Sequence, residues 1–276
     1  MKPAAFEYVA PTSLDEAVAA LAEHGEDAKV LAGGQSLIPL LSLRLARPTA
    51  LVDLNDVDEL QHLTVNGSVR VGAMTRHRHV EHSAGIATSA PLLAAAVPYI
   101  GHAAIRTRGT IGGSLAHADP AAELPAVAVA LDATFAVRSL RGTRTITARD
   151  FFDGYFTTTL APDEVLTEIT FPAAPTGTKV SVQEMARRHG DFAMVAVVAQ
   201  QTPDGDTRLA LVNVADKPYR ATEAEAAARA GADPEEIADL ATRDLEPATD
   251  LHATSAYRKH VARVLVRRAL IELRGA

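Results

Sequence analysis

Two Gly-Gly turns, each set between apolar segments, constrain the fold of this chain more than any other feature. The first turn lies in KVLAGGQSLIPLL at residues 32–36, and the second lies in RTRGTIGGSLAHADP at residues 110–114. Glycine permits a positive φ angle and lacks the Cβ that keeps a ligand away from the backbone. Successive amides in such a turn can converge on an anion, and a helix that follows adds its positive end. The turns therefore favour an anion-binding cleft, with an ordinary tight turn as the alternative for either pair alone.

Neither turn matches a common catalytic or nucleotide-binding motif. The segment AGGQSL does not fit G-x-G-x-x-G, and no G-K-[ST] follows, so the Rossmann and P-loop interpretations both fail. Ser114, His117 and Asp119 are the three residue types of a hydrolase catalytic triad. However, G-x-S-x-G is absent, and three residues this close in sequence rarely adopt triad geometry. The residues alone predict an α/β protein that can bind an anion.

The first 55 residues alternate between strand and helix patterns. Short apolar segments predict three strands, at 6–9, 29–32 and 50–54. Ser13 and Glu16 have the spacing of a capping box, which opens a helix between the first two strands. The leucine-rich segment 37–45 predicts a second, buried helix with Pro39 in its first turn. This β-α-β-α-β order predicts an α/β unit.

Turn signals and composition divide the rest of the chain. Glycine-containing pairs predict three hairpins, at 66–67, 141–142 and 204–205. The segment PAAPTGT at 172–178 predicts a domain boundary. Strand patterns follow it, and then helices, the last of which has an apolar face and a basic face that we expect to be solvated. The chain is therefore predicted to be α+β, with a first domain at 1–175, divided near 55–60, and a second at 176–276.

Composition excludes several classes of protein. The 276 residues carry a net charge of −7, so a nucleic-acid partner is not expected. The chain has no cysteine and therefore forms no disulfide and no iron–sulfur cluster of its own. The N-terminal segment shows no signal-peptide pattern, and no apolar run is long enough to cross a membrane. We therefore expect a cytoplasmic protein that does not require a membrane.

Two groups of basic residues have competing interpretations. His77, His79 and His82 lie in RHRHVEH and invite a metal-site interpretation. On a helix only His79 and His82 share a face, so surface helix residues are the better interpretation. Arg106 and Arg108 can meet a phosphate, the carboxylates of a partner or only solvent.

Five segments together resemble the flavin-binding medium subunit of the xanthine dehydrogenase and carbon monoxide dehydrogenase family of molybdenum hydroxylases. They are AGGQSLIPLLSLRLARP, IRTRGTIGGSLAHADPAAELP, DEVLTEITFP, ARRHGDFAMVAV and SAYRKHVARVLVRRAL. They occur in the family's order, so the resemblance is specific. It implies a two-subdomain FAD-binding domain of the vanillyl-alcohol-oxidase type, followed by a smaller C-terminal domain of antiparallel strands and helices.

The resemblance also implies which residues contact FAD. In the family, backbone amides of the first turn hold the pyrophosphate, which here means Ala32, Gly33, Gly34, Gln35, Ser36 and Leu37. The second FAD-binding turn of the family matches Thr110, Ile111, Gly112, Gly113 and Ser114 of this chain. Glu123, with Asp119 nearby, matches an acidic residue that contacts the adenosine part. Leu166 matches a residue on the adenine side, and Phe192 lies near the flavin ring. Non-covalent FAD is favoured, because no cysteine is present to form a linkage, and no metal ligand or catalytic acid or base is assigned.

The function implied by the resemblance is electron transfer. A large subunit with a molybdenum cofactor hydroxylates the substrate, and a small subunit with [2Fe–2S] clusters carries electrons to the FAD of this chain. The FAD then reduces an external acceptor, in an assembly expected to be a dimer of heterotrimers. The alternatives are a stand-alone FAD-dependent oxidoreductase with its own organic substrate, and an assembly module that has lost its flavin.

Overall fold

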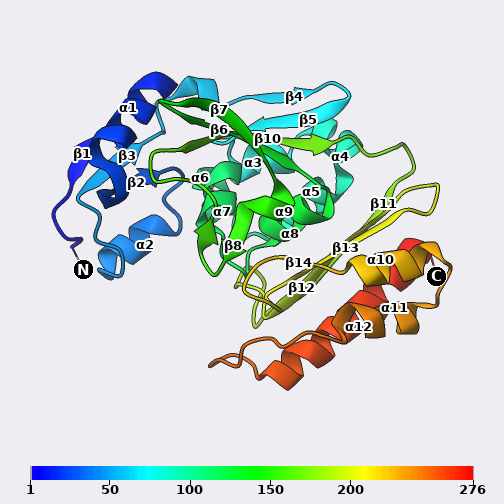
Figure 1. Ribbon diagram of the computed structural model, residues 1–276. Coiled ribbons are helices and arrows are strands. Elements are labelled where there is room, and N and C mark those ends of the chain that lie inside the picture. Colours follow the sequence, from blue (N-terminus) through cyan, green and yellow to red (C-terminus); the bar gives the residue numbers. More distant parts are fainter. Residues whose placement is uncertain (1, 276) are drawn as a thin grey trace.

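The N-terminal segment forms a small parallel sheet with two helices in the computed structural model, which describes residues 2–275 (Figure 1). Its elements are β1 (Glu7–Val9), α1 (Leu14–His24), β2 (Ala28–Leu31), α2 (Leu37–Ser42) and β3 (Ala50–Asp53). The strand order is β1-β3-β2, and β3 is parallel to both neighbours. Ser13 caps α1 by accepting the Glu16 N–H at 3.2 Å. The predicted β-α-β-α-β unit is therefore confirmed.

The segment that contains α2 is less buried than its sequence predicts. Leu41 is buried, but Ile38, Leu43 and Leu45 are 44%, 58% and 74% exposed. The helix ends at Ser42, and Arg44 beyond it has a positive φ of 58°. A continuous apolar run identifies a helix but has no polar positions to mark its solvent side, so the burial prediction was wrong.

A five-stranded antiparallel sheet forms the centre of the N-terminal part, with the strand order β4-β5-β10-β6-β7. Its strands are β4 (Leu63–Val65), β5 (Ser68–Gly72), β6 (Thr134–Ser139), β7 (Gly142–Thr147) and β10 (Val165–Pro172). The predicted hairpins at 66–67 and 141–142 are both present. Gly67 and Gly142 supply the positive φ angles of these turns, 66° and 118°.

Six helices connect β5 to β6. They are α3 (His77–Glu81), α4 (Ala84–Ser89), α5 (Pro91–Ala96), α6 (Ala103–Arg108), α7 (Ile111–His117) and α8 (Glu123–Ala130). Every residue of α8 is buried, so this helix is the centre of the main hydrophobic core. The connection from β7 to β10 contains α9 (Ala148–Phe151), β8 (Phe152–Gly154) and β9 (Thr157–Thr158). The N-terminal part also contains three short 3₁₀ turns, at Gly25–Asp27, Asp58–Leu60 and Val97–Tyr99.

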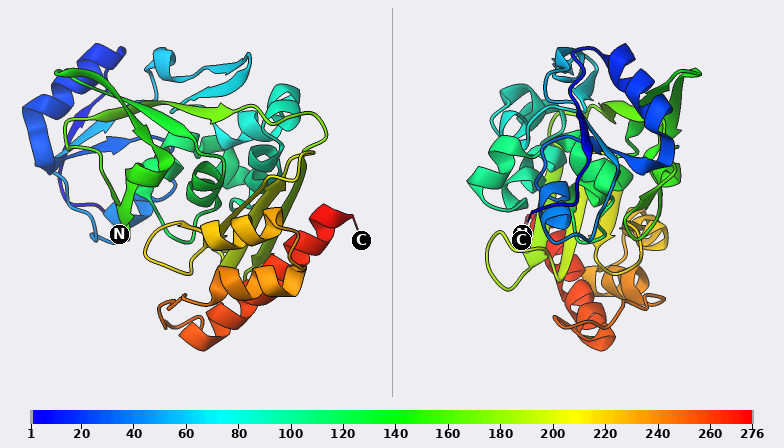
Figure 2. Two further views of the ribbon diagram at one scale, coloured as in Figure 1. Left: turned by 45° about the vertical axis from the view of Figure 1, so that its right-hand side comes forward. Right: turned by 90° about the vertical axis from the view of Figure 1, so that its left-hand side faces the viewer.

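The C-terminal part is an antiparallel sheet covered on one face by helices (Figures 1 and 2). Its strands are β11 (Lys179–Met185), β12 (Val195–Gln201), β13 (Thr207–Val212) and β14 (Tyr219–Arg220), in that order across the sheet. Its helices are α10 (Thr222–Arg229), α11 (Pro234–Thr242) and α12 (Ser255–Arg274). The predicted hairpin at 204–205 joins β12 to β13, with Gly205 at φ 87°. The predicted α+β architecture is confirmed.

This C-terminal sheet separates two hydrophobic cores. Successive strand residues point to opposite faces, so Ala196 and Val198 of β12 pack into the core of the N-terminal part. Val195 and Val197 face α10, α11 and α12. The sheet is therefore buried on both faces, and it contributes side chains to the hydrophobic cores of both parts of the chain.

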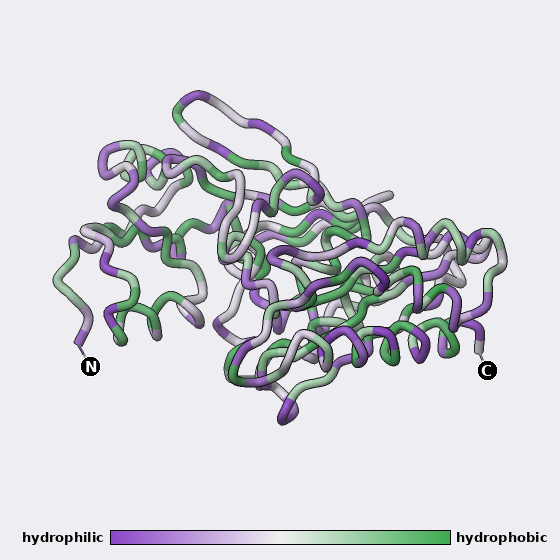
Figure 3. The backbone as a smooth tube through the Cα atoms, turned by 60° about the horizontal axis from the view of Figure 1, so that its bottom comes forward, coloured by the Kyte–Doolittle hydropathy of each residue, from purple (hydrophilic) through white to green (hydrophobic). Residues whose placement is uncertain are grey.

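Helix α12 is amphipathic, as its sequence predicts, with one exception. Hydrophobic and hydrophilic residues alternate along the helical part of the chain near its C-terminus (Figure 3). Arg258, however, is only 2% exposed, so it does not belong to a solvated basic face. It donates to the Met194 carbonyl at 2.5 Å and to the Asp250 carboxylate at 2.6 Å. The helical period assigns a face to each residue but does not reveal acceptors brought there by other segments.

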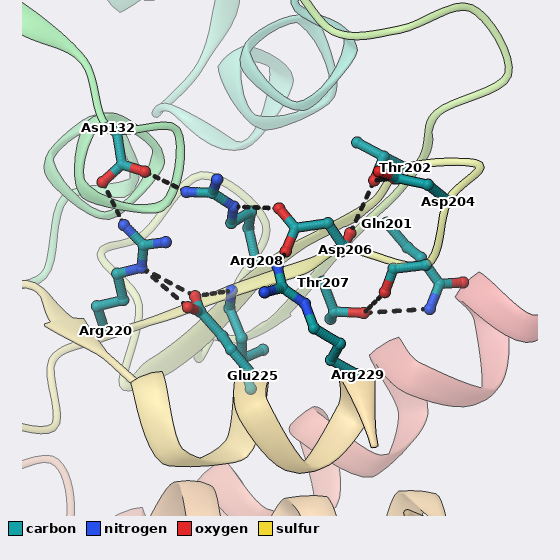
Figure 4. Close-up of polar contacts among 12 residues, drawn as sticks. Asp132, Gln201, Thr202, Asp204, Asp206, Thr207, Arg208, Arg220, Glu225 and Arg229 are labelled. Atoms are coloured by element: carbon teal, nitrogen blue, oxygen red, sulfur yellow. Dashed lines mark hydrogen bonds and ion pairs between the residues drawn. The ribbon is translucent and has the colours of Figure 1, made fainter. Parts of the chain in front are cut away.

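Charged side chains also join the two parts of the chain (Figure 4). Asp132, just after α8, accepts from both Arg208 of β13 and Arg220 of β14. Arg208 also pairs with Asp206 at 2.8 Å, and Arg220 pairs with Glu225 at 2.9 Å. We call Asp132, Arg208 and Arg220 the Asp132 clasp, because one carboxylate of the N-terminal part holds two cations of the C-terminal part.

Among residues 2–275, no helix combines the length and the apolar character that crossing a bilayer requires.

Candidate functional site

The two glycine turns lie against each other. An ideal Cβ built on Gly33 would stand 2.3 Å from the Arg108 carbonyl oxygen and 2.8 Å from the Gly109 Cα. A Cβ on Gly113 would stand 3.2 Å from the Cβ of Ala32. Only glycine allows such close backbone approach, so the turns meet because both lack side chains at the contact. The structure thus brings together the two segments that the sequence singled out.

The first turn presents a row of open backbone donors. It follows β2, and Gly34 takes the left-handed conformation with φ 74°. The N–H groups of Gly33, Gly34, Gln35 and Ser36 donate to no acceptor among residues 2–275. The Gln35 side chain folds back to donate to the Gly33 carbonyl at 3.0 Å. Partly buried backbone donors are normally satisfied, so this row is suited to an external acceptor.

The second turn is held by its own protein contacts. Thr110 caps α7, and its hydroxyl accepts the Gly113 N–H at 3.1 Å. The amides of Ile111 and Gly112 donate to the carbonyls of Thr75 and Ala73, at 3.0 and 2.9 Å, and the Ser114 amide donates to the Thr110 carbonyl. The two turns are therefore unequal: the first offers free amides, whereas the second offers chiefly the hydroxyl groups of Thr110 and Ser114.

Arg76 joins the two turns. Its Nη1 donates to the Arg108 carbonyl at 2.6 Å, and its Nη2 donates to the Asn55 side-chain oxygen at 2.6 Å. Asn55 in turn donates to the Ala32 carbonyl at 3.0 Å. Burial lowers the pKa of Arg76, and the nearby Arg108 acts in the same direction, but a guanidinium remains charged at neutral pH. A positive charge therefore stands where the two turns meet.

Sequence reasoning missed Arg76 and Asn55. Asn55 lies two residues beyond the end of β3, and the carboxyl end of a parallel strand is where ligands gather in α/β sheets, so its position was a usable signal. Arg76 had no such signal, because its partners lie on segments distant in sequence.

His77 contradicts the prediction that the histidines of RHRHVEH are surface residues. It is 4% exposed, and a Cβ on Gly109, just before the second turn, would stand 2.9 Å from its Nδ1. Burial lowers its pKa to about 4, and Arg106 and Arg76 add to this effect. The imidazole is therefore neutral at pH 7 and supports the second turn by packing. The sequence correctly predicts a helix at this position, but it does not predict that the segment at Gly109 covers His77.

Arg106 also has a role that the sequence did not predict. Its side chain is 11% exposed and pairs with Glu81 at 2.8 Å. It also donates to the carbonyls of Ile100 and Gly101, at 3.1 and 3.0 Å. The ion pair of Arg106 with Glu81 therefore links α6 to α3, whereas Arg108 is exposed.

Buried carboxyl groups surround the start of α8. Glu123, its first residue, is 5% exposed, and burial raises its pKa to about 8, with Glu184 and Asp119 adding to the effect. Glu184 of β11 makes a side-chain contact with Glu123, and burial raises its pKa to about 7. Burial also raises the pKa of Asp119, whose carboxylate accepts the Ala121 N–H at 2.9 Å. Glu123 and Asp119 lie close enough for their charges to interact, and their predicted contact with the adenosine part stays a prediction. Glu184 was missed, because it comes from the C-terminal part.

This carboxyl cluster should make stability depend on pH. Glu123 and Glu184 keep their protons to higher pH in the folded protein than in the unfolded chain, where carboxyl pKa values are near 4.5. Stability is therefore lost as pH rises from about 4.5 through about 7 to 8. We expect Glu184→Gln, which cannot ionise, to raise Tm at pH 8.5 by about 2–4 °C and to leave it unchanged near pH 4.5.

Thermal unfolding of both proteins at the two pH values tests this expectation. Glu23→Gln, on the exposed side of α1, is the matched control and should leave Tm unchanged at both. An equal effect of Glu184→Gln at pH 4.5 and pH 8.5 would show that Glu184 does not ionise in this range.

The remaining predicted contact residues lie on other elements. Leu166 of β10 is 6% exposed and pairs with Val137 of β6. Phe192 is 64% exposed, in the connection between β11 and β12. Their predicted places beside the adenine and the flavin ring stay predictions that rest on the resemblance.

The geometry of the paired turns defines a class of ligand. Four free amides, the Arg76 guanidinium and two hydroxyl groups offer hydrogen bonds and positive charge, which fit the diphosphate of a dinucleotide. A dinucleotide cofactor is therefore the class of ligand that this geometry fits.

Comparison with known families identifies the chain within this class. Residues 4–174 match the family described as the FAD binding domain in molybdopterin dehydrogenase, and residues 180–273 match the carbon monoxide dehydrogenase flavoprotein C-terminal domain. The chain belongs to the family of flavoprotein subunits of molybdopterin dehydrogenases, with FAD as the family cofactor, and the resemblance drawn from the sequence is confirmed.

Curated relatives and solved structures agree with this assignment. The 6-hydroxypseudooxynicotine dehydrogenase complex subunit alpha of Paenarthrobacter nicotinovorans is 38% identical, over 98% of this chain and 95% of its own length. The caffeine dehydrogenase subunit beta of Pseudomonas sp. (strain CBB1) is 43% identical, over 80% of this chain and 77% of its own. A chain of carbon monoxide dehydrogenase from Hydrogenophaga pseudoflava superposes with a TM-score of 0.96 at 39% identity, covering 100% of this chain and 99% of that one.

Proposed function

We propose that this chain is the FAD-binding electron-transfer subunit of a heteromeric molybdenum hydroxylase. The observation that carries the proposal is the contact between the two glycine turns, with a row of free amides on the first. The names of the relatives support it, because the protein from Paenarthrobacter nicotinovorans is a subunit of a dehydrogenase complex. Enzymes of this kind divide cofactors among their subunits, and the present chain supplies the flavin.

In this proposal the chain binds and orients FAD without a covalent bond. Amides of residues 33–36 hold the pyrophosphate, and Arg76 neutralises part of its charge. Hydroxyl groups of Thr110 and Ser114 bind from the second turn, and Glu123 accepts hydrogen bonds from the adenosine part. Flavin chemistry supplies the electron transfer, while the protein determines the position and reduction potential of the flavin.

Partner subunits complete the proposed enzyme. A large subunit with the molybdenum cofactor oxidises the substrate, and a small [2Fe–2S] subunit delivers the electrons to this chain. The chain passes them to an external acceptor, in a cytoplasmic dimer of heterotrimers. No cysteine is present in this chain, so any iron–sulfur cluster has to come from a partner.

Flavin reduction in two preparations tests the proposal. The purified full chain, mixed with FAD and passed through gel filtration, should retain about one FAD and should stay oxidised when candidate substrates are added. The complex purified with its neighbouring gene products should contain molybdenum and iron and should reduce its flavin when its substrate is added.

Two results would contradict the proposal. Substrate-driven flavin reduction by the isolated chain would favour a stand-alone oxidoreductase. A colourless chain that does not retain added FAD would favour an assembly module.

A further inference from the structure

A cavity lies at the border between the two parts of the chain. Its volume is about 350 Å³, at the lower end of the range for small-molecule sites. The N-terminal part contributes Val129 of α8, Arg149 of α9 and Phe152 of β8. The C-terminal part contributes Lys217 and Arg220, on either side of Pro218. None of these residues belongs to the glycine turns, so the cavity is distinct from the proposed FAD site.

Three cations line this cavity, and no carboxylate does. Arg149 and Lys217 are exposed and form no ion pair or side-chain hydrogen bond with any residue from 2 to 275. This concentration of positive charge contrasts with the net charge of −7 of the whole chain. Two nearby carboxylates, Asp150 and Asp216, adjoin the cations in sequence but do not line the cavity. Arg220 is paired with Asp132 and Glu225, so the unpaired positive charge of the lining comes from Arg149 and Lys217, and it suits an anion.

Arg220 is fixed in place for such an anion. Its side chain is 13% exposed, its Nε pairs with Glu225 at 2.9 Å, and its Nη1 belongs to the Asp132 clasp (Figure 4). Its Nη2 donates to no acceptor within the described part of the chain. A guanidinium that is already held by two carboxylates loses little freedom when it donates its remaining N–H groups to a ligand.

The neutral walls of the cavity restrict the ligand further. Val129, Phe152 and Pro218 give it an apolar surface beside the cations. The cavity is too small for a whole dinucleotide but can hold one charged group with a small apolar part. A phosphate group matches the cations, because it accepts charge-assisted hydrogen bonds from several donors at once.

We propose that this cavity binds the phosphate group of a small organic phosphomonoester, through Arg149, Lys217 and the free side of Arg220. Because Arg149 belongs to the N-terminal part and Lys217 and Arg220 belong to the C-terminal part, a bound phosphate touches both parts of the chain at their junction. The proposal does not depend on FAD binding at the glycine turns.

Binding of phenyl phosphate to the full chain, saturated with FAD and measured by calorimetry, tests the proposal. Phenyl phosphate carries the anion and a small apolar ring, whereas phenol carries the ring alone. We expect phenyl phosphate to bind and phenol not to bind. Lys217→Met and Arg149→Met should each weaken phenyl phosphate about tenfold, because each removes one charge-assisted contact. Both side chains are exposed, so these variants should fold as the wild type does.

Arg268→Met, on the exposed side of α12, is the matched control and should bind phenyl phosphate as the wild type does. Equal binding by the wild type, Lys217→Met and Arg149→Met would overturn the proposal, as would an absence of binding at millimolar concentrations. In the chain without FAD, binding that is lost in Gly33→Val but kept in Lys217→Met would place the phosphate at the glycine turns and would also overturn it. A chain that takes up no FAD, yet binds phenyl phosphate through Lys217, would contradict only the proposed function.

Discussion

Replacing Gly33 by valine should abolish FAD retention. The new Cβ would stand 2.3 Å from the Arg108 carbonyl oxygen, a backbone atom that cannot rotate away. The two turns would have to separate, and the free amides of the first turn would leave their positions. Loss of two charge-assisted hydrogen bonds to a pyrophosphate corresponds to about 3 kcal/mol or more, which is at least a hundredfold in affinity. The ratio of flavin to protein absorbance after gel filtration measures the loss.

Further glycine variants separate this effect from misfolding. Gly113→Val places a Cβ 2.7 Å from the buried Thr110 hydroxyl, which caps α7, so we expect it to disturb the second turn and to retain less FAD. Gly85→Ala, in α4, is the control, because the nearest atom to its Cβ would belong to the Val65 side chain, at 3.1 Å, and no backbone atom is among its nearest neighbours. Circular dichroism reports whether each variant is folded. A folded Gly33→Val protein with a full complement of FAD would show that the paired turns do not hold the cofactor.

Replacing Arg76 by methionine should weaken FAD binding about 10- to 100-fold, because the variant loses hydrogen bonds to a charged group worth about 1.5–3 kcal/mol. Two contacts disappear together, one to the Arg108 carbonyl and one to Asn55, so both turns lose their common support. The positive charge at the junction disappears as well. Titration of the apoprotein with FAD, followed by quenching of flavin fluorescence, gives the change in Kd.

A lysine variant and a neighbouring arginine provide the comparison. Arg76→Lys keeps the charge but cannot donate in two directions from one planar group, so its Kd should lie between those of the wild type and Arg76→Met. Arg78→Met, at an exposed position of α3 where the arginine side chain makes no hydrogen bond within residues 2–275, should bind FAD normally. Equal affinities for Arg76→Met and Arg78→Met would show that the network does not support the site.

The parts of the site that the sequence predicts are those determined locally. A glycine pair after a strand marks a turn whatever surrounds it, and the capping box at Ser13 fixes where α1 starts. The hairpins at 66–67, 141–142 and 204–205 follow for the same reason. Local signals therefore gave most of the elements and both turns.

The parts that the sequence does not predict depend on contacts between distant segments. Arg76 lies 32 residues from the carbonyl of Arg108 that it binds. His77 is buried because the segment at Gly109 covers it, and Glu184 reaches Glu123 only because the C-terminal sheet packs on α8. No local pattern distinguishes a buried polar residue of this kind from an exposed one. The contact between the turns was itself a hypothesis until the fold placed Gly33 against Arg108.

The C-terminal sheet has a consequence for how such a protein can be divided. Ala196 and Val198 fill one core while Val195 and Val197 fill the other, so each core is closed by the same strand. A fragment that stops before β11 would expose the apolar sides of α5 and α8 to water. A fragment that starts at β11 would expose the face of its sheet that packs on α5 and α8 in the whole chain. The two halves are therefore structurally interdependent, and neither is suited to exchange as a free-standing module.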